Sequence, residues 1–314
     1  MGPKWKWLAK IFAFFGIGVG LLGIGTFTQV NGISSAVNNF FDSNNAWTVS
    51  LFGRTYSWTV VISCLILTFC VALVLIGGIQ RISKVAQVIV PFMAATYFLA
   101  GILIILFNIT DVPAAILTIV QSAFGLKAAA GGALGAMVVA MQKGIARGIF
   151  SNEAGLGSAP IAAAAARTNE PVRQGLVSMT ATFIDTIIIC SITGIAIVLT
   201  GAYDMGLEGV AVTTKAFQLG LPFPDGVASF ILMLCLVFFA FTTILGWDYY
   251  SERCLEYLTN GKKKCIKAYR WVYILCVFIG PYMTVSAVWT IADIFNGLMA
   301  IPNLIAPVSY THLT

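Results

Sequence analysis

The chain has 314 residues, of which 59% are hydrophobic and only 10% are charged, whereas an ordinary soluble domain carries about 25% charged residues. This composition excludes a soluble domain and indicates an all-α, polytopic membrane protein, because apolar runs of about 20 residues recur along the whole length. The net charge of +6 does not indicate nucleic-acid binding, since the basic residues stand in short segments between apolar runs.

Eight apolar windows predict transmembrane helices. In chain order they cover residues 8–30, 59–79, 85–107, 133–166, 176–200, 227–250, 269–288 and 290–308. A shorter apolar segment at 113–124 begins with a proline and is expected to form an interfacial or re-entrant helix. We therefore predict one transmembrane domain over residues 1–308, followed by an atypical polar tail at 309–314 that contains His312.

The distribution of basic residues predicts the orientation. If the N-terminus is cytoplasmic, thirteen of the 18 Lys and Arg residues fall on the cytoplasmic side and three fall outside. The other two, Lys143 and Arg147, lie within the fourth window. Cytoplasmic loops are richer in Lys and Arg than external ones, so both ends of the chain are expected in the cytoplasm.

The first window is rich in glycine. Its stretch from Gly18 to Gly23 matches the spacing of a dinucleotide-binding fingerprint, but it lies within an apolar span and follows no predicted strand. Glycines one helical turn apart, such as Gly16 and Gly20, instead favour close helix packing. At the end of this window Thr28 and Gln29 are either interfacial polar residues or part of a cavity.

The fourth window is interrupted by a polar, glycine-rich stretch at residues 143–160. An unwound backbone cannot face lipid, so this stretch must be buried in protein or line water. Secondary transporters build midplane sites at such helix breaks. Ser158 and Pro160 suit the start of a second half-helix. The alternative is a buried structural network of Lys143, Arg147 and Glu153 beside a kink.

Two later windows also carry polar groups. Asp185 lies deep in the fifth window, where an acid is costly unless it faces a polar cavity or a partner such as Arg147. In the sixth window Thr243 and Trp247 share one helix face. Trp247 could equally be an interfacial anchor.

The stretch at 144–160, Gly-Ile-Ala-Arg-Gly-Ile-Phe-Ser-Asn-Glu-Ala-Gly-Leu-Gly-Ser-Ala-Pro, resembles the signature of the alanine or glycine:cation symporter family, the sodium:alanine symporters. The resemblance also includes residues 18–29, 182–186 and 241–247, and so covers nearly the whole chain. It implies a leucine-transporter-like inverted-repeat fold in a prokaryotic cell (inner) membrane. The implied activity is sodium-coupled import of alanine or glycine by alternating access, with no enzymatic reaction and no cofactor beyond the coupling sodium ion.

The resemblance also implies roles for particular residues. Gln29 and Asn152 would make polar contacts with the amino acid, while Phe150 and Trp247 would limit the room for its side chain. Thr242 or Thr243 would offer a hydroxyl oxygen to sodium, a hard cation that prefers oxygen ligands, and Thr243 would also line the substrate.

The chain departs from the family pattern at its start. Its windows match the third to tenth helices, so the first broken helix of the fold is expected to be missing and the chain to be truncated at the N-terminus. Two other functions remain open on the same scaffold, a non-transporting amino-acid sensor or a channel. An intramembrane hydrolase using Ser151 or Ser158 is poorly supported, because a nucleophilic serine needs a base and no window contains a histidine.

Overall fold

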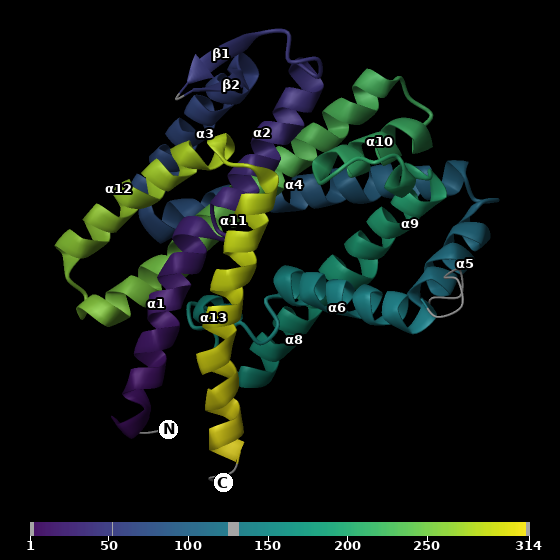
Figure 1. Ribbon diagram of the computed structural model, residues 1–314. Helices are drawn as coiled ribbons and strands as arrows, with labels where there is room; N and C mark the ends of the chain where they lie inside the picture. Colours follow the sequence, from purple (N-terminus) through teal and green to yellow (C-terminus); the bar gives the residue numbers. More distant parts are fainter. Residues whose placement is uncertain (1–2, 52, 125–131, 312–314) are drawn as a thin grey trace. The chain divides into compact units, whose positions relative to one another are not determined.

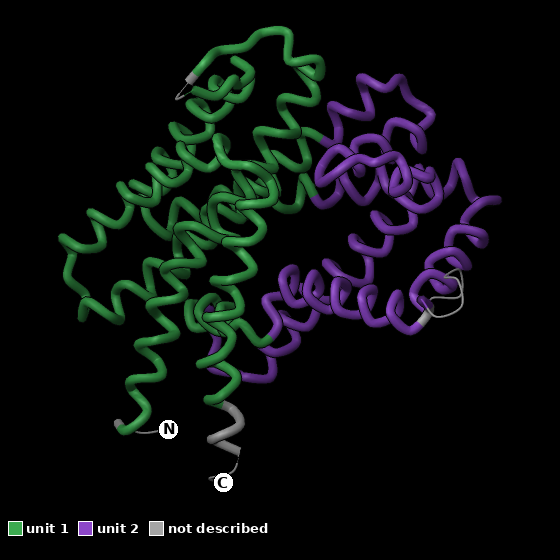
Figure 2. Tube along the Cα trace, viewed as in Figure 1, with its two compact units in different colours: residues 1–93, 155–165, 233–314 green, residues 94–154, 166–232 purple. Residues whose placement is uncertain are grey.

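The computed structural model describes residues 3–51, 53–124 and 132–311 (Figure 1). The described chain is almost entirely helical, and its strands are β1 (Thr48–Leu51) and β2 (Arg54–Ser57), which pair as an antiparallel hairpin. The chain divides into two compact units (Figure 2). Unit 1 holds residues 1–93, 155–165 and 233–314, and unit 2 holds residues 94–154 and 166–232.

Unit 1 is built around a buried core between its long helices. It contains η1 (Pro3–Trp5), α1 (Lys6–Leu22), α2 (Phe27–Phe41), the hairpin, α3 (Trp58–Ile76), the first part of α4 (Gly78–Phe107), α7 (Ala159–Ala163), most of α11 (Asp225–Thr259), α12 (Lys263–Ile279), η4 (Gly280–Tyr282) and α13 (Val285–Thr311). α1 packs along α13, and α2 and α12 both pack on α3. Val71, Ile244, Tyr273 and Val277 are fully buried in the core.

The glycines of α1 explain how closely its neighbours approach. A Cβ atom on Gly20 would lie 2.5 Å from the Ser251 side chain of α11, and one on Gly18 would clash with the Phe295 ring of α13. Real Cβ atoms do not come this close, so only glycine fits at either position. The interpretation of this stretch as a helix-packing surface is confirmed.

Unit 2 contains a set of shorter helices. They are the rest of α4, α5 (Val112–Ala123), α6 (Ala133–Asn152), α8 (Pro171–Thr182), the π-helix η2 (Phe183–Cys190), α9 (Ser191–Leu199), η3 (Ala202–Asp204) and α10 (Val210–Gly220). α9 packs against α5 and α10, and η2 packs against α6. The Tyr97 and Thr193 hydroxyl oxygens lie 2.6 Å apart and join α4 to α9.

Six helical segments among the described residues are long and apolar enough to cross a membrane. They are Lys6–Phe41, Trp58–Ile76, Gly78–Phe107, Pro171–Leu199, Asp225–Thr259 and Val285–Ala306. The polytopic, all-α class is confirmed. Two of the eight predicted windows have no counterpart in this set: α6 is made polar by Lys143 and Arg147, and α12 has only 17 residues and begins in a lysine cluster.

Three predicted boundaries are wrong. The window at 8–30 is not one helix, because α1 ends at Leu22 and α2 begins at Phe27. The window at 269–288 runs across the end of α12, where η4 and an extended Met283 separate it from α13. The second half of the fourth window was expected to reach residue 166, but α7 ends at Ala163.

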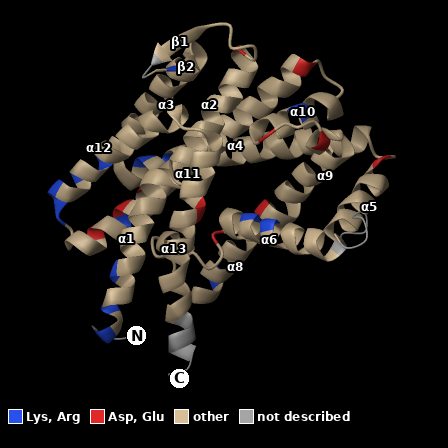
Figure 3. Cartoon of the chain, in the orientation of Figure 1, with Lys and Arg blue, Asp and Glu red and all other residues tan. Residues whose placement is uncertain are grey.

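The polar tail lies partly outside the described residues. Residues 309–311 continue α13 as helix, whereas 312–314, including His312, are not described. Figure 3 shows two clusters of basic residues in unit 1, at the start of α1 and at the turn between α11 and α12. These clusters include Lys4, Lys6, Lys262, Lys263 and Lys264.

Candidate functional site

The break between α1 and α2 is the first feature that can hold a ligand. A helix end leaves backbone carbonyls without partners, and here nearby side chains supply donors. The Thr26 hydroxyl donates to the Leu21 carbonyl, and the Ile24 carbonyl accepts from Thr28 Oγ1 and from Gln29 Nε2, each at 3.1 Å. The break is therefore capped locally by the polar residues that follow the glycines.

The break lies directly against α11. A Cβ atom on Gly25 would be 2.6 Å from Trp247 Cβ and 2.8 Å from the Gly20 carbonyl oxygen. The Trp247 side chain is correspondingly buried, with 2% of its surface exposed. The Tyr273 hydroxyl lies 2.7 Å from the Ile244 carbonyl and 3.2 Å from the Gly25 carbonyl, so α12 ties the break to α11.

Thr242 and Thr243 lie on α11 one turn before Trp247. The Thr242 hydroxyl donates to the Phe238 and Phe239 carbonyls at 3.1 and 2.9 Å, and the Thr243 hydroxyl donates to the Phe239 carbonyl at 2.9 Å. Since each proton is directed at the helix backbone, the oxygen lone pairs point elsewhere. Both hydroxyl oxygens can therefore serve as ligands for a cation.

The polar stretch at 143–160 passes from one unit to the other. α6 ends at Asn152, and Glu153, Gly155 and Gly157 follow with φ values of 51°, 74° and 83°. Residues up to 154 belong to unit 2, and residues from 155 belong to unit 1. Three of the five residues at 153–157 have positive φ. An α-helix needs negative φ at every residue, so α6 ends here.

Within unit 1 this linker is fixed to α13. The Asn303 side chain donates to the Gly155 carbonyl at 2.9 Å, and Leu156 and Ser158 are buried. Ser158 stands at the N-cap of α7 as predicted, but its side chain makes no capping hydrogen bond to that helix, and Pro160 lies in the first turn.

Within unit 2 the end of α6 is bonded to the π-helix η2. Asn152 Oδ1 accepts a hydrogen bond from the Thr186 hydroxyl at 2.9 Å, and the Ser151 hydroxyl donates to Asp185 at 2.5 Å. Asp185 thus has the polar partner that its depth in an apolar run required. π-helical turns are rare and often occur at functional sites.

A cavity of about 500 Å³ opens beside this contact. Asn152, Ser178, Thr182 and Thr186 supply its polar lining, and its apolar lining is Met179, Phe183 and Ile187. This mixture of a few polar groups with apolar walls is typical of small-molecule sites. Phe150, two positions before Asn152 in α6, is not part of this lining, and the Arg147 guanidinium lies 5.6 Å from its ring centre.

The predicted site residues therefore fall into two groups. Gln29, Thr242, Thr243 and Trp247 lie in unit 1 at the α1–α2 break and on α11, while Phe150 and Asn152 lie in unit 2. Sequence reasoning missed Thr186 as the partner of Asn152, although it lies in the family-like segment 182–186. It also missed Tyr273, which looked like an ordinary aromatic residue of an apolar helix.

Comparison with known proteins shows what the chain is similar to. Residues 1–313 match the model of the sodium:alanine symporter family. An uncharacterized transporter of Haemophilus influenzae is 52% identical over 303 residues, which are 96% of this chain and 62% of that protein.

Two further relatives carry names that include a substrate. The sodium/alanine symporter AgcS of Methanococcus maripaludis is 42% identical over 304 residues, 96% of this chain and 62% of that protein. The probable sodium/glutamine symporter GlnT of Bacillus subtilis is 40% identical over 268 residues, 85% of this chain and 55% of that protein. The chain thus spans less than two thirds of the length of these relatives.

Proposed function

Because the chain belongs to the sodium:alanine symporter family, a family of transporters and not of enzymes, we propose that it serves sodium-coupled import of small neutral amino acids, with alanine or glycine as substrate. The observation that carries this proposal is the family match over residues 1–313. The capped break beside α11 and the polar end of α6 are the structural features that such a transporter needs.

We assign the sodium ion to the region of Thr242 and Thr243. Their hydroxyl oxygens have their protons directed at the Phe238 and Phe239 carbonyls, and hydroxyl and carbonyl oxygens are the ligands that hard cations prefer. The α1–α2 break packs against Trp247, which lies on the same helix as the two threonines, and it is a source of further backbone carbonyls. Sodium is the coupling ion in this proposal, and no other cofactor is required.

We assign the amino acid to polar contacts with Gln29 and Asn152. Gln29 uses its amide nitrogen on the Ile24 carbonyl, which leaves its side-chain oxygen for an ammonium donor. Asn152 Oδ1 accepts from Thr186, so its amide nitrogen can donate to a carboxylate. Phe150 and Trp247 are bulky, so as residues of the proposed site they would favour a short substrate side chain.

We also propose that the protein lies in a prokaryotic inner membrane with both chain ends in the cytoplasm, and that it works by alternating access. The orientation is supported by the basic clusters at the start of α1 and at the α11–α12 turn (Figure 3). These clusters lie at the ends of unit 1 that are away from the β1–β2 hairpin. Cytoplasmic segments are enriched in such residues.

Uptake of labelled alanine into proteoliposomes tests the proposal. The product of the gene is reconstituted, and uptake is measured with an inward sodium gradient and with an equal gradient of choline. We expect uptake only with sodium, and competition by unlabelled glycine. Equal uptake in choline would refute the sodium coupling, and strong competition by glutamine but not by glycine would refute the substrate assignment.

A further inference from the structure

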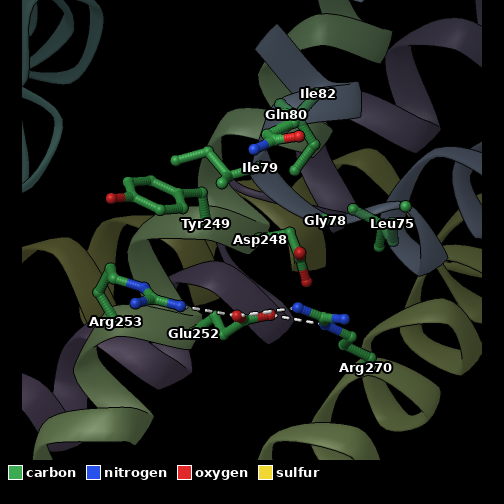
Figure 4. Close-up of a pocket in the computed structure, with 11 residues that line it drawn as sticks. Leu75, Gly78, Ile79, Gln80, Ile82, Asp248, Tyr249, Glu252, Arg253 and Arg270 are labelled. Atoms are coloured by element: carbon green, nitrogen blue, oxygen red, sulfur yellow. Dashed lines mark hydrogen bonds and ion pairs between the residues drawn. The ribbon is translucent and has the colours of Figure 1, made fainter. Parts of the chain in front are cut away.

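A second polar cavity lies in unit 1, and its lining includes none of the residues assigned above. It has a volume of about 330 Å³ and lies where the α3–α4 junction faces α11 and α12 (Figure 4). Its charged lining residues are Asp248, Glu252, Arg253 and Arg270. Gln80 also lines it and is exposed, so the cavity has a path to solvent.

Glu252 uses both of its carboxylate oxygens on the two arginines. Arg270 donates from Nε to Oε2 at 2.7 Å and from its terminal nitrogen to Oε1 at 3.0 Å, and Arg253 donates to Oε1 at 2.9 Å. Figure 4 shows the Glu252 carboxylate between the two guanidinium groups. Arg253 also forms an ion pair with Glu256. Both arginines therefore have carboxylate partners other than Asp248, and the one buried arginine atom without a partner among the described residues is Arg253 Nε.

Asp248 is the carboxylate of this cluster that has an oxygen without a partner. It is 2% exposed, and its Oδ1 atom makes no hydrogen bond to any residue in the part of the chain that the structure describes. A buried polar atom without a partner costs about 1–3 kcal/mol. Protonation would not remove this cost, because the resulting hydroxyl group would need an acceptor in the same place.

One further wall of the cavity contributes partial negative charge. Leu75, Gly77 and Gly78 line the cavity at the C-terminal end of α3, and a helix C-terminus carries a partial negative charge. The Arg81 guanidinium of α4 bonds to the Leu73 carbonyl. Among the described residues there is no group of three or more His, Cys, Asp or Glu side chains that could hold a metal ion. A single carboxylate with neutral oxygens suits a monovalent cation better than a divalent one.

We propose that this cavity binds a small monovalent cation, sodium in the first instance, through the Asp248 carboxylate, at a site separate from Thr242 and Thr243. The cation supplies the partner that Oδ1 lacks, and it enters from the side of Gln80. The inference goes beyond the proposed function and does not depend on it, because cation binding can be measured without any amino acid.

Equilibrium binding of radioactive sodium to the purified protein tests this site. Asp248→Asn removes the charge while keeping the shape of the side chain. We expect at least roughly a tenfold loss of affinity at one sodium site, since contacts to a charged group are worth about 1.5–3 kcal/mol. Asp225→Asn, the same change at an exposed position at the start of α11, is the matched control and should bind sodium as the unaltered protein does.

The double variant Thr242→Val, Thr243→Val separates the two cation sites. It should retain the site that Asp248→Asn weakens. The proposal is overturned if Asp248→Asn binds sodium like the unaltered protein, or if the double variant loses all sodium binding. It is also overturned if choline, a much larger cation than sodium, protects the protein from thermal unfolding as well as sodium does.

A second substitution covers the case in which Asp248→Asn does not fold. Asp248→Glu keeps the carboxylate but moves it by one methylene group. We expect sodium binding to persist with a changed affinity and a changed preference for sodium over potassium. Affinity and preference identical to those of the unaltered protein would contradict the assignment of this carboxylate as a ligand.

Discussion

The two helix breaks of this protein end their helices in different ways. Between α1 and α2 the chain keeps negative φ at Gly23, and the polar side chains of Thr26, Thr28 and Gln29 cap the freed carbonyls. After α6 the backbone itself turns, through positive φ at Glu153, Gly155 and Gly157. At the first break glycine allows a neighbouring helix to approach closely, and at the second break glycine mainly allows positive φ. The same residue type should therefore respond differently to substitution at the two breaks.

The largest expected effect is at the first break. Gly25→Ala places a Cβ atom 2.6 Å from Trp247 Cβ and 2.8 Å from the backbone oxygen of Gly20, and a backbone atom cannot move aside cheaply. We expect a loss of about 1–3 kcal/mol in the free energy of unfolding. The measurement is the thermal unfolding midpoint of the purified protein in detergent.

Gly32→Ala is the matched control for this substitution. Gly32 lies in α2, and a Cβ atom there would meet nothing within 4 Å. Alanine is the better helix former by about 1 kcal/mol, so the control should be neutral or stabilising. If both variants unfold at the same temperature, close packing is not the reason for glycine at the first break.

The second break should show a smaller, conformational effect. Gly155 has φ of 74°, and the nearest atom to an added Cβ, in the Leu304 side chain, would be 3.4 Å away. Gly155→Ala therefore introduces backbone strain of about 1–2 kcal/mol without a severe clash. Gly155→Asn should cost less than Gly155→Ala in the same unfolding assay, because asparagine tolerates left-handed backbone. Equal losses would argue against the conformational account.

The contact beside the second break should have an effect of about 1 kcal/mol. Thr186→Val removes the hydrogen bond to Asn152 Oδ1, and a typical hydrogen bond contributes about 0.5–1.5 kcal/mol. In the proposed transporter the loss also frees the Asn152 side chain to rotate, so the KM for alanine should rise. Thr186→Ser keeps the hydroxyl and should keep the KM. A raised KM in both variants would assign the effect to lost packing by the threonine methyl group.

The smallest effect is expected at the far end of α2, where the hairpin begins. The Ser57 hydroxyl donates to the Asp42 carboxylate, and so does the Ala46 N–H, each at 2.7 Å. These bonds lower the pKa of Asp42 below its ordinary value of 3.8, the Ser57 bond having the larger influence. The stabilisation is present above the unfolded-state pKa and is lost as the pH falls through the lower, folded-state pKa.

Tryptophan fluorescence can follow this transition, because Trp47 and Trp58 flank the hairpin and are bonded through their backbones. The unaltered protein should show a small spectral change on acidification below the ordinary pKa of an aspartate. Asp42→Asn should resemble the acidified form at neutral pH and show little further change. If Asp42→Asn showed the same fluorescence change on acidification as the unaltered protein, Asp42 would not be the group that titrates.

The comparison of the two breaks also shows what the sequence could predict. The break after α6 was expected, because charged residues and glycines interrupt an apolar run at 143–160. The window at 8–30 predicts a continuous helix across the break at 23–26, because glycines such as Gly16 and Gly20 also fit a helix-packing surface. The close approach of Gly25 to Trp247 is a tertiary contact that this local pattern does not predict. The following run of Thr26, Thr28 and Gln29 was the available local signal.

Other features depend on contacts distant in the sequence. The short helix α5 and the apolar helices α3 and α11 follow from hydrophobicity alone. The bond between Asn152 and Thr186 spans 34 positions, and the link from Tyr273 to Gly25 spans 248. The π-helical turns of η2 have no distinct residue pattern. Asp248 could not be singled out from the sequence, because the lack of a partner for its Oδ1 atom is a property of the folded cavity.

The central claim is that the polar end of α6 holds a small amino acid in a sodium-dependent manner. Binding of labelled alanine to the purified protein, in sodium chloride and in choline chloride, tests it most directly when the Asn152→Ala variant is measured beside the unaltered protein. We predict binding in sodium only, and its loss in Asn152→Ala with expression and unfolding temperature preserved. Equal alanine affinity in choline, or unchanged affinity in Asn152→Ala, would contradict the account.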